Sequence, residues 1–235
     1  MARLVRAMTF GCMGLIFLAF QPPLEATIPP GLKPNDMQPE LFLILPADAD
    51  HAFAPAIEDA LSAAPVAAVL IQRGQRDEAA YRTAARALIL AIQSSGAAAL
   101  LDNATNLAIE LSADGVHVTS GLDDIRTALG RLKPRLIVGA GGLHTRDEVM
   151  SAGEAGIDYL FFGSLGPGPA RADVAEMAEW WVENFTIPAV WFPGDAGPAD
   201  GDPATEFLAL RHSVWNAPGG VAAALASLKS ERGAA

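Results

Sequence analysis

Two pairs of polar residues follow apolar runs in this sequence, and their types suit phosphate and metal binding. Gln72 and Arg73 end the run VLIQR, and Asp102 and Asn103 end the run ALLDN. A guanidinium can form two parallel hydrogen bonds to a phosphate, and an amide can orient a ring. A carboxylate beside an amide can hold Mg²⁺ while substrate phosphates fill the other positions. The alternatives are a solvated loop arginine for the first pair and a helix cap for the second.

A second carboxylate for a metal follows the next apolar run, GVHV. Asp123 and Asp124 come shortly after it, and either could join Asp102 around Mg²⁺. Both also fit the first turn of a helix, where negative charge is favourable. No cluster of Cys and His with zinc spacing occurs in the sequence.

Histidine is the residue type best suited to proton transfer near neutral pH, and two histidines lie close to these loops. His144 follows the glycines of VGAGGLHT in a loop that opens a predicted helix, where backbone amides attract anions. We therefore treat His144 as a candidate catalyst, with Gly141 and Gly142 as backbone contacts. His117 lies inside GVHV and is predicted to pack in the core.

Three further loops carry glycine or cations after apolar runs. Gly163 follows DYLFF, Gly194 follows AVWFP, and Arg211 and His212 follow EFLAL. Glycine lets the backbone approach a ligand closely, although it can also serve only to turn the chain. We predict that these positions contact a ligand.

These candidates are positioned by a regular alternation of apolar runs and helical patterns. Strands are predicted at 41–45, 66–71, 97–101, 114–118, 135–139, 158–162, 188–192 and 206–210. Their nearly continuous apolar character is typical of parallel strands that are buried on both faces. Helices are predicted at 77–94, 122–131, 145–155, 173–184 and 218–230. Segment 193–205 is so rich in Pro, Gly and Asp that its helix should be short or replaced by loop.

Eight strands alternating with helices predict an α/β fold, a single-domain (β/α)₈ TIM barrel. Sites in this fold lie at the carboxyl ends of the strands, where all the candidates fall. A chain of 235 residues with 51% hydrophobic content suits one such domain.

The net charge of -11 and the absence of a basic run argue against nucleic-acid binding. An acidic balance does not exclude a local basic pocket for a small phosphorylated molecule.

Residues 1–36 are predicted to be an extension that precedes a barrel at 37–235. Arg3 and Arg6 come before an apolar run at 8–20, as in a signal peptide, but Met37 is an alternative start. The run, at about 13 residues, is short for a membrane span. The single cysteine, Cys12, gives no sign of an oxidising compartment. A cytoplasmic location is predicted; export or anchoring through residues 1–26 is the alternative.

In the order and spacing of these motifs the chain resembles the thiamine phosphate synthase family over about residues 40–230. The firmest matches are ADGVHV to the family's ADGVHLGQ, GLHT to GVSxHT, and GIDYLFFG to GADYIGFGPIFPT. TEFLALRHSVW resembles the family's last strand and phosphate loop. The family comprises (β/α)₈ barrels that join hydroxymethylpyrimidine diphosphate to thiazole phosphate and release pyrophosphate.

The resemblance implies roles for the candidates. Asp102 with Asp123 or Asp124 would bind Mg²⁺, and Gln72, Arg73 and Asn103 would hold the pyrimidine diphosphate. Backbone near Gly163, Gly194 and Arg211 would take the thiazole phosphate. Small phosphorylated pyrimidine and thiazole molecules are thus the implied partners, and homo-oligomerisation is left open.

Several family residues differ here. The family's Asn-Asp pair reads Asp102-Asn103, the serine before the histidine is Gly141 or Gly142, and the lysine after the sixth strand is absent, with Arg171 the nearest cation. Because the metal and the lysine would neutralise the leaving pyrophosphate, two alternatives stand beside the synthase. One is a thiazole tautomerase-like isomerase in which His144 moves protons, and the other is a catalytically eroded barrel that binds phosphorylated thiamine precursors.

Overall fold

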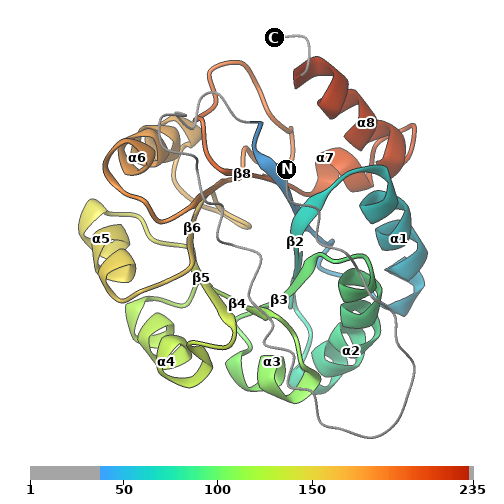
Figure 1. The fold of residues 1–235 in the computed structure, drawn as a ribbon, viewed down its shortest axis with the longest axis horizontal. Helices are drawn as coiled ribbons and strands as arrows, with labels where there is room; N and C mark the ends of the chain where they lie inside the picture. The colour runs from blue at the N-terminus through green and yellow to red at the C-terminus, as the bar shows by residue number, and fades with distance from the viewer. Residues whose placement is uncertain (1–37, 233–235) are drawn as a thin grey trace, which may run out of the picture.

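A closed barrel of eight parallel strands forms the centre of the protein. The computed structural model describes residues 38–232, and in it each strand pairs with the next, with β8 returning to β1 (Figure 1). The strands are β1 Glu40–Ile44, β2 Val66–Ile71, β3 Ala98–Asp102, β4 Gly115–Val118, β5 Ile137–Ala140, β6 Tyr159–Phe162, β7 Ala189–Trp191 and β8 Phe207–Leu210. All eight predicted strands and the TIM-barrel fold are confirmed. The predicted extension at 1–36 lies outside the described residues.

Helices form a ring around the barrel (Figure 1). They are the 3₁₀ helix η2 His51–Phe53, and the α-helices α1 Ala54–Ala63, α2 Glu78–Ser94, α3 Thr105–Leu111, α4 Leu122–Leu132, α5 Arg146–Glu154, α6 Arg171–Asn184, α7 His212–Trp215 and α8 Val221–Arg232. The five predicted helices are confirmed. Between β7 and β8 the described chain contains loop and no helix, as predicted for residues 193–205. In the described range, no helix is both long and apolar enough to cross a membrane.

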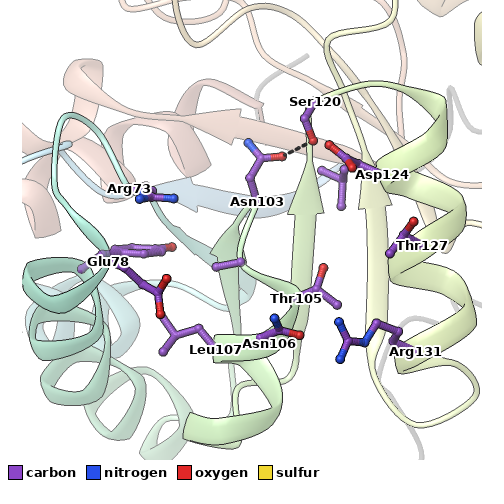
Figure 2. Close-up of a pocket in the computed structure, with 13 residues that line it drawn as sticks. Arg73, Glu78, Asn103, Thr105, Asn106, Leu107, Ser120, Asp124, Thr127 and Arg131 are labelled. Carbon is purple, nitrogen blue, oxygen red and sulfur yellow. Dashed lines mark hydrogen bonds between the residues drawn. The ribbon is translucent and has the colours of Figure 1, made fainter.

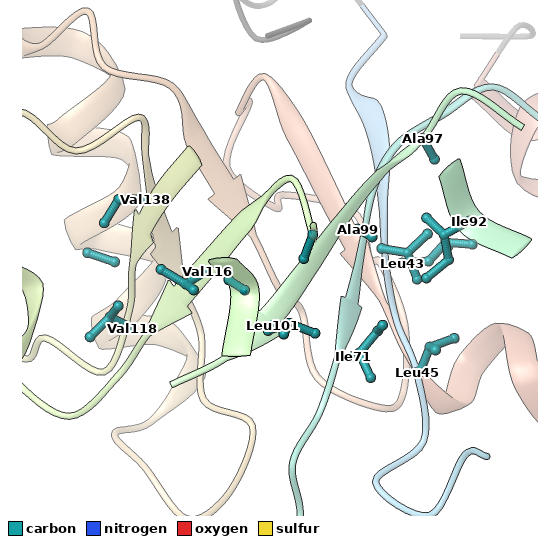
Figure 3. Close-up of a cluster of buried hydrophobic side chains, with 14 of the residues drawn as sticks. Leu43, Leu45, Ile71, Ile92, Ala97, Ala99, Leu101, Val116, Val118 and Val138 are labelled. Carbon is teal, nitrogen blue, oxygen red and sulfur yellow. The ribbon is translucent and has the colours of Figure 1, made fainter. Parts of the chain in front are cut away.

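Side chains alternate along each strand between the barrel interior and the layer under the helices. Phe42, Leu70, Leu100 and Phe161 belong to the interior cluster. Their neighbours in sequence pack outward, in a second cluster to which α2 adds Ile92 (Figure 3). This alternation determines which side chains, just after the end of each strand, face the mouth of the barrel.

Three carboxylates brace the amino-terminal end of the barrel, opposite the predicted site. Each immediately precedes an even-numbered strand and accepts the backbone N–H of the strand before it. The bonds are Ala99 N to Asp114 at 2.7 Å, Val138 N to Asp158 at 2.7 Å, and Ala189 N to Glu206 at 2.8 Å. These three acidic residues therefore stabilise strand pairing, which fits the separation of stability and chemistry between the two ends of such barrels.

Candidate active site

The predicted site residues surround the carboxyl-terminal mouth of the barrel. Continuing the alternation of each strand by one or two residues separates inward-facing from outward-facing positions. The inward positions are Gln72, Asp102, Gly141, Gly163, Gly194 and Arg211, and the outward positions are Arg73, Asn103, Gly142 and His212. Six loops thus contribute predicted residues to one rim.

Tyr81 of α2 ties the ends of β2 and β3 together. Its hydroxyl donates to the carbonyl oxygen of Ile71 at 2.6 Å and accepts the N–H of Asp102 at 2.8 Å. The ring is buried, and this burial raises the pKa of the hydroxyl. Asp102 Oδ2 in turn accepts the N–H of Arg73 at 3.2 Å. The two polar pairs predicted from the sequence therefore form one hydrogen-bonded unit.

Asn103 joins this unit to the loop after β4. Its backbone is left-handed, with φ of 49°, a conformation that asparagine tolerates better than most residues. Its Nδ2 donates to Asp102 Oδ1 at 2.8 Å, and its Oδ1 accepts the N–H of Thr119 at 2.8 Å. Helix α3 has Ala104 at its N-cap and no side-chain cap bond, so neither member of the pair acts as the alternative helix cap.

Asp102 is the most enclosed of the predicted metal ligands. Its partial burial raises the pKa of the carboxyl, while the hydrogen bonds from Arg73 and Asn103 lower it. Asp124 lines a neighbouring cavity, whereas Asp123 is fully exposed and pairs with Arg126 at 3.1 Å. No group of three or more His, Cys, Asp or Glu side chains comes together as a metal site within residues 38–232. The three predicted carboxylates do not form one cluster, because adjacent residues in the first turn of α4 point in different directions.

A polar cavity of about 310 Å³ opens beside this unit. Figure 2 shows Arg73 on one wall and Asp124 on the other, with Asn103 and Ser120 between them. The Nε of Arg73 donates to the carbonyl oxygen of Arg76 at 3.1 Å. Its two Nη groups make no hydrogen bond to any other described residue. The side of the mouth formed by β2–β4 therefore presents an available cation beside polar side chains.

The opposite side of the mouth is built from glycine loops. A cavity of about 280 Å³ lies there, and Gly163, Arg171, Trp191 and Gly194 are among the residues that line it. Gly163 has φ of 138°, and a Cβ at this position would lie 2.7 Å from atoms of Phe192. Only glycine fits there, which accounts for this part of the predicted pattern.

Arg211 enters this side from the end of β8, and three of its five N–H donors are bound by other described residues. Nε and Nη2 donate to the two oxygens of Asp195, each at 2.8 Å, and Nη1 donates to the carbonyl oxygen of Leu165 at 2.9 Å. The guanidinium lies 5.3 Å from the ring centre of Phe192. The bonds from Arg211 hold the pKa of Asp195 below its usual range.

Arg171 is bound in a similar way. Its Nη1 donates to the carbonyl oxygen of Pro193 at 2.8 Å, and its Nη2 pairs with Asp202. Asp195 and Asp202 both belong to the loop at 193–205, so one loop binds both arginines on this side. Sequence reasoning missed both acidic partners because nothing local marks them.

His144 lies at the start of α5 and is exposed. The N–H groups of His144 and Thr145 both donate to Glu148 Oε2 at 2.9 Å, and the Thr145 hydroxyl completes a capping box. These bonds lower the pKa of Glu148. The amides that were expected to attract an anion therefore already bind a carboxylate of the chain itself.

His117 forms the floor between the two sides, fully buried as predicted. Its Nδ1 lies 3.0 Å from the Tyr159 hydroxyl, and burial lowers the pKa of the imidazole to about 4. The Nε2 has no hydrogen-bond partner among the described residues. A Cβ at Gly141 would lie 2.9 Å from this Nε2, and Gly142 has φ of 66°. A serine at either position would require His117 or the backbone to shift.

Comparison with known proteins identifies a family and agrees with the barrel fold. A family model described as thiamine monophosphate synthase matches residues 41–198. The thiamine-phosphate synthase of Hyphomonas neptunium is 34% identical over 202 residues, which cover 79% of this chain and 90% of the relative. The thiamine-phosphate synthase of Rhodospirillum centenum is 34% identical over 194 residues, which cover 79% of this chain and 94% of the relative. A thiamine phosphate pyrophosphorylase structure from Pyrococcus furiosus superposes with a TM-score of 0.65 at 22% identity, covering 81% of this chain and 94% of that one.

Proposed function

Because this chain belongs to the thiamine monophosphate synthase family, we propose that it joins hydroxymethylpyrimidine diphosphate to thiazole phosphate and releases pyrophosphate. The observation that carries the proposal is the hydrogen-bonded unit of Arg73, Asp102 and Asn103 beside a polar cavity. Arg73 supplies a cation and Asp124 a carboxylate on the wall of that cavity, and Asp102 is hydrogen-bonded to both Arg73 and Asn103.

The reaction breaks one bond and forms another. The bond between the pyrimidine methylene carbon and the diphosphate oxygen breaks, and its electron pair leaves with pyrophosphate. The thiazole nitrogen then donates its lone pair to the methylene carbon. Arg73 would stabilise the negative charge that develops on the leaving group. Gln72, buried at an inward position at the end of β2, would orient the pyrimidine ring through its amide.

Asp102, at the end of β3, and Asp124, on the cavity wall, are the carboxylates that could each contribute an oxygen to Mg²⁺. Each oxygen of Asp102 accepts one hydrogen bond and keeps a lone pair, and Mg²⁺ needs only one or two carboxylates when a substrate's phosphates bind it as well. When bound, the ion would neutralise charge on the diphosphate. Asp123, turned to solvent, would not take part.

The thiazole phosphate would bind on the side formed by β6–β8. The backbone at Gly163 and Gly194 can approach a ligand closely, and Arg211 and His212 follow β8. Loops after strands seven and eight commonly bind phosphate in this fold.

Incubation of the purified protein with both precursors and Mg²⁺ tests the proposal. Thiamine phosphate should form, and Asp102→Ala should reduce its rate by at least about tenfold, because a carboxylate near the leaving group is lost. Asp59→Ala, which removes an exposed carboxylate from α1, is the matched control and should retain the rate. No product above background would overturn the synthase reaction.

The isomerase and binding alternatives give different outcomes in related assays. Isomerisation that survives chelation of metal but not His144→Ala would favour the tautomerase. Tight binding of both precursors without turnover would favour the binding protein. Among the contacts of residues 38–232, none favours the isomerase over the synthase.

A further inference from the structure

The loop at 193–205 places a carboxylate where an incoming phosphate would meet Arg211. Asp195 is bound to both Nε and Nη2 at 2.8 Å, which is the paired geometry that a phosphate would use. Nη1 donates one N–H to the carbonyl oxygen of Leu165, so three of the five guanidinium N–H groups are bound. A ligand phosphate can therefore reach this pair of donors only by displacing Asp195.

The surroundings of the Arg211–Asp195 ion pair stabilise it. The Arg211 side chain is 13% exposed and lies over the Phe192 ring, whereas the Asp195 side chain is 45% exposed. Leaving a partly buried guanidinium without an acceptor is unfavourable, so a carboxylate of the chain satisfies it when no ligand is bound.

The same loop is attached at a second point, which keeps Asp195 near Arg211. Arg171 pairs with Asp202, and Asp202 Oδ2 also accepts the N–H of Ala199 at 2.9 Å. The N–H of Gly197 donates to the carbonyl oxygen of Gly194 at 3.2 Å. Asp195 thus lies on a short, internally bonded segment that is held by one ion pair at Asp195 itself and by another at Asp202.

We propose that Asp195 is a specificity-determining residue, an internal anion that competes with the phosphate of the thiazole substrate for Arg211. This inference rests on the proposed synthase function. Because a phosphate that takes the Nε and Nη2 position must replace an existing ion pair, it gains little net affinity from Arg211. The protein therefore discriminates weakly between thiazole phosphate and the corresponding thiazole alcohol.

Calorimetric titration of the full chain with inorganic phosphate tests the competition without requiring turnover. Asp195→Asn frees Arg211 of its anion and should tighten phosphate binding roughly five- to tenfold at low salt. Asp200→Asn makes the same charge change on the same loop, at an exposed carboxylate that is bound to no described residue, and should leave the affinity unchanged. Asp195→Ala is a second variant that should act in the same direction.

Steady-state kinetics then test the specificity. Asp195→Asn should lower KM for thiazole phosphate by a similar factor and leave KM for the alcohol unchanged. Unaltered or weaker phosphate binding in both folded Asp195 variants would overturn the proposal, as would an equal gain in Asp200→Asn. If phosphate binding tightens while no variant makes thiamine phosphate, the competition stands and the synthase function fails.

Discussion

The two sides of the barrel mouth use the same residue types in opposite ways. On the β2–β4 side, the carboxylate of Asp102 binds a backbone N–H and an amide, and the Nη groups of Arg73 bind no described residue. On the β6–β8 side, carboxylates from one loop bind Arg171 and Arg211 directly. The comparison shows that the number of cations at a site matters less than what already binds them. We therefore expect the diphosphate to bind on the first side, and an anion on the second side to compete with Asp195 for Arg211.

The largest expected effect is on the side with the available cation. Arg73→Ala should lower kcat/KM for the pyrimidine diphosphate by about 10²- to 10³-fold, because the charge of the leaving group loses its counter-ion. Arg86→Ala, on the exposed face of α2, is the control and should have little effect. Steady-state kinetics with each substrate varied would measure both. Retention of activity in Arg73→Ala would show that this side does not bind the diphosphate.

His117 lies beneath both sides of the mouth, so its titration should change the stability of the whole barrel and not of one side alone. The pKa of the folded imidazole is about 4, below the usual 6.5. Below pH 6.5 the unfolded chain takes up a proton that the folded chain does not accept until about pH 4. The free energy of unfolding should therefore be fully maintained above pH 6.5 and fall by up to about 3 kcal/mol between pH 6.5 and 4.

Urea denaturation of the wild type and of His117→Asn across this range would measure that contribution. The variant should show a smaller loss of stability on acidification than the wild type. Equal losses in the two proteins would mean that other groups cause the pH dependence.

Tyr81 contacts only the β2–β4 side of the mouth, so loss of its hydroxyl should affect binding of one substrate and not of the other. Tyr81→Phe removes the hydroxyl that bonds to Ile71 and Asp102 and leaves two buried backbone groups without a partner. We expect a loss of about 2 kcal/mol in the free energy of unfolding. KM for the pyrimidine diphosphate should rise, while KM for thiazole phosphate should stay unchanged. An equal rise in both KM values would indicate general loosening of the barrel.

The smallest expected effect concerns the cation that is already paired. Arg211→Ala should raise KM for thiazole phosphate by less than about tenfold, because the bound Asp195 already offsets most of the attraction to phosphate. The same kinetics with Arg73→Ala provide the comparison. A larger loss from Arg211→Ala than from Arg73→Ala would reverse the assignment of the two sides.

Much of this architecture was predictable, because it depends on local patterns. The apolar runs predicted every strand, and the Pro, Gly and Asp content of 193–205 predicted a loop. Alternation also separates Asp102, which points inward, from Asn103. The ion pairs of Arg211 with Asp195 and of Arg171 with Asp202 join residues 16 and 31 positions apart, with no periodic pattern between them. Such pairings depend on how loops fold over the mouth, and sequence spacing alone does not reveal them.

The two neighbouring carboxylates at the start of α4 could not be distinguished from the sequence. The sequence placed Asp123 and Asp124 equally near the mouth, but consecutive residues on a helix point about 100° apart. As a result Asp124 lines the cavity while Asp123 pairs with Arg126 at the surface. Helix phase decides between such neighbours, and the exact start of a helix is what a sequence specifies least well.

Separate calorimetric titrations with the two substrates test the difference between the two sides most directly. The wild-type protein with Mg²⁺ should bind the pyrimidine diphosphate at least about tenfold more tightly than thiazole phosphate, and Asp195→Asn should narrow that gap. Equal or tighter binding of thiazole phosphate by the wild type, unaffected by Asp195→Asn, would contradict the account.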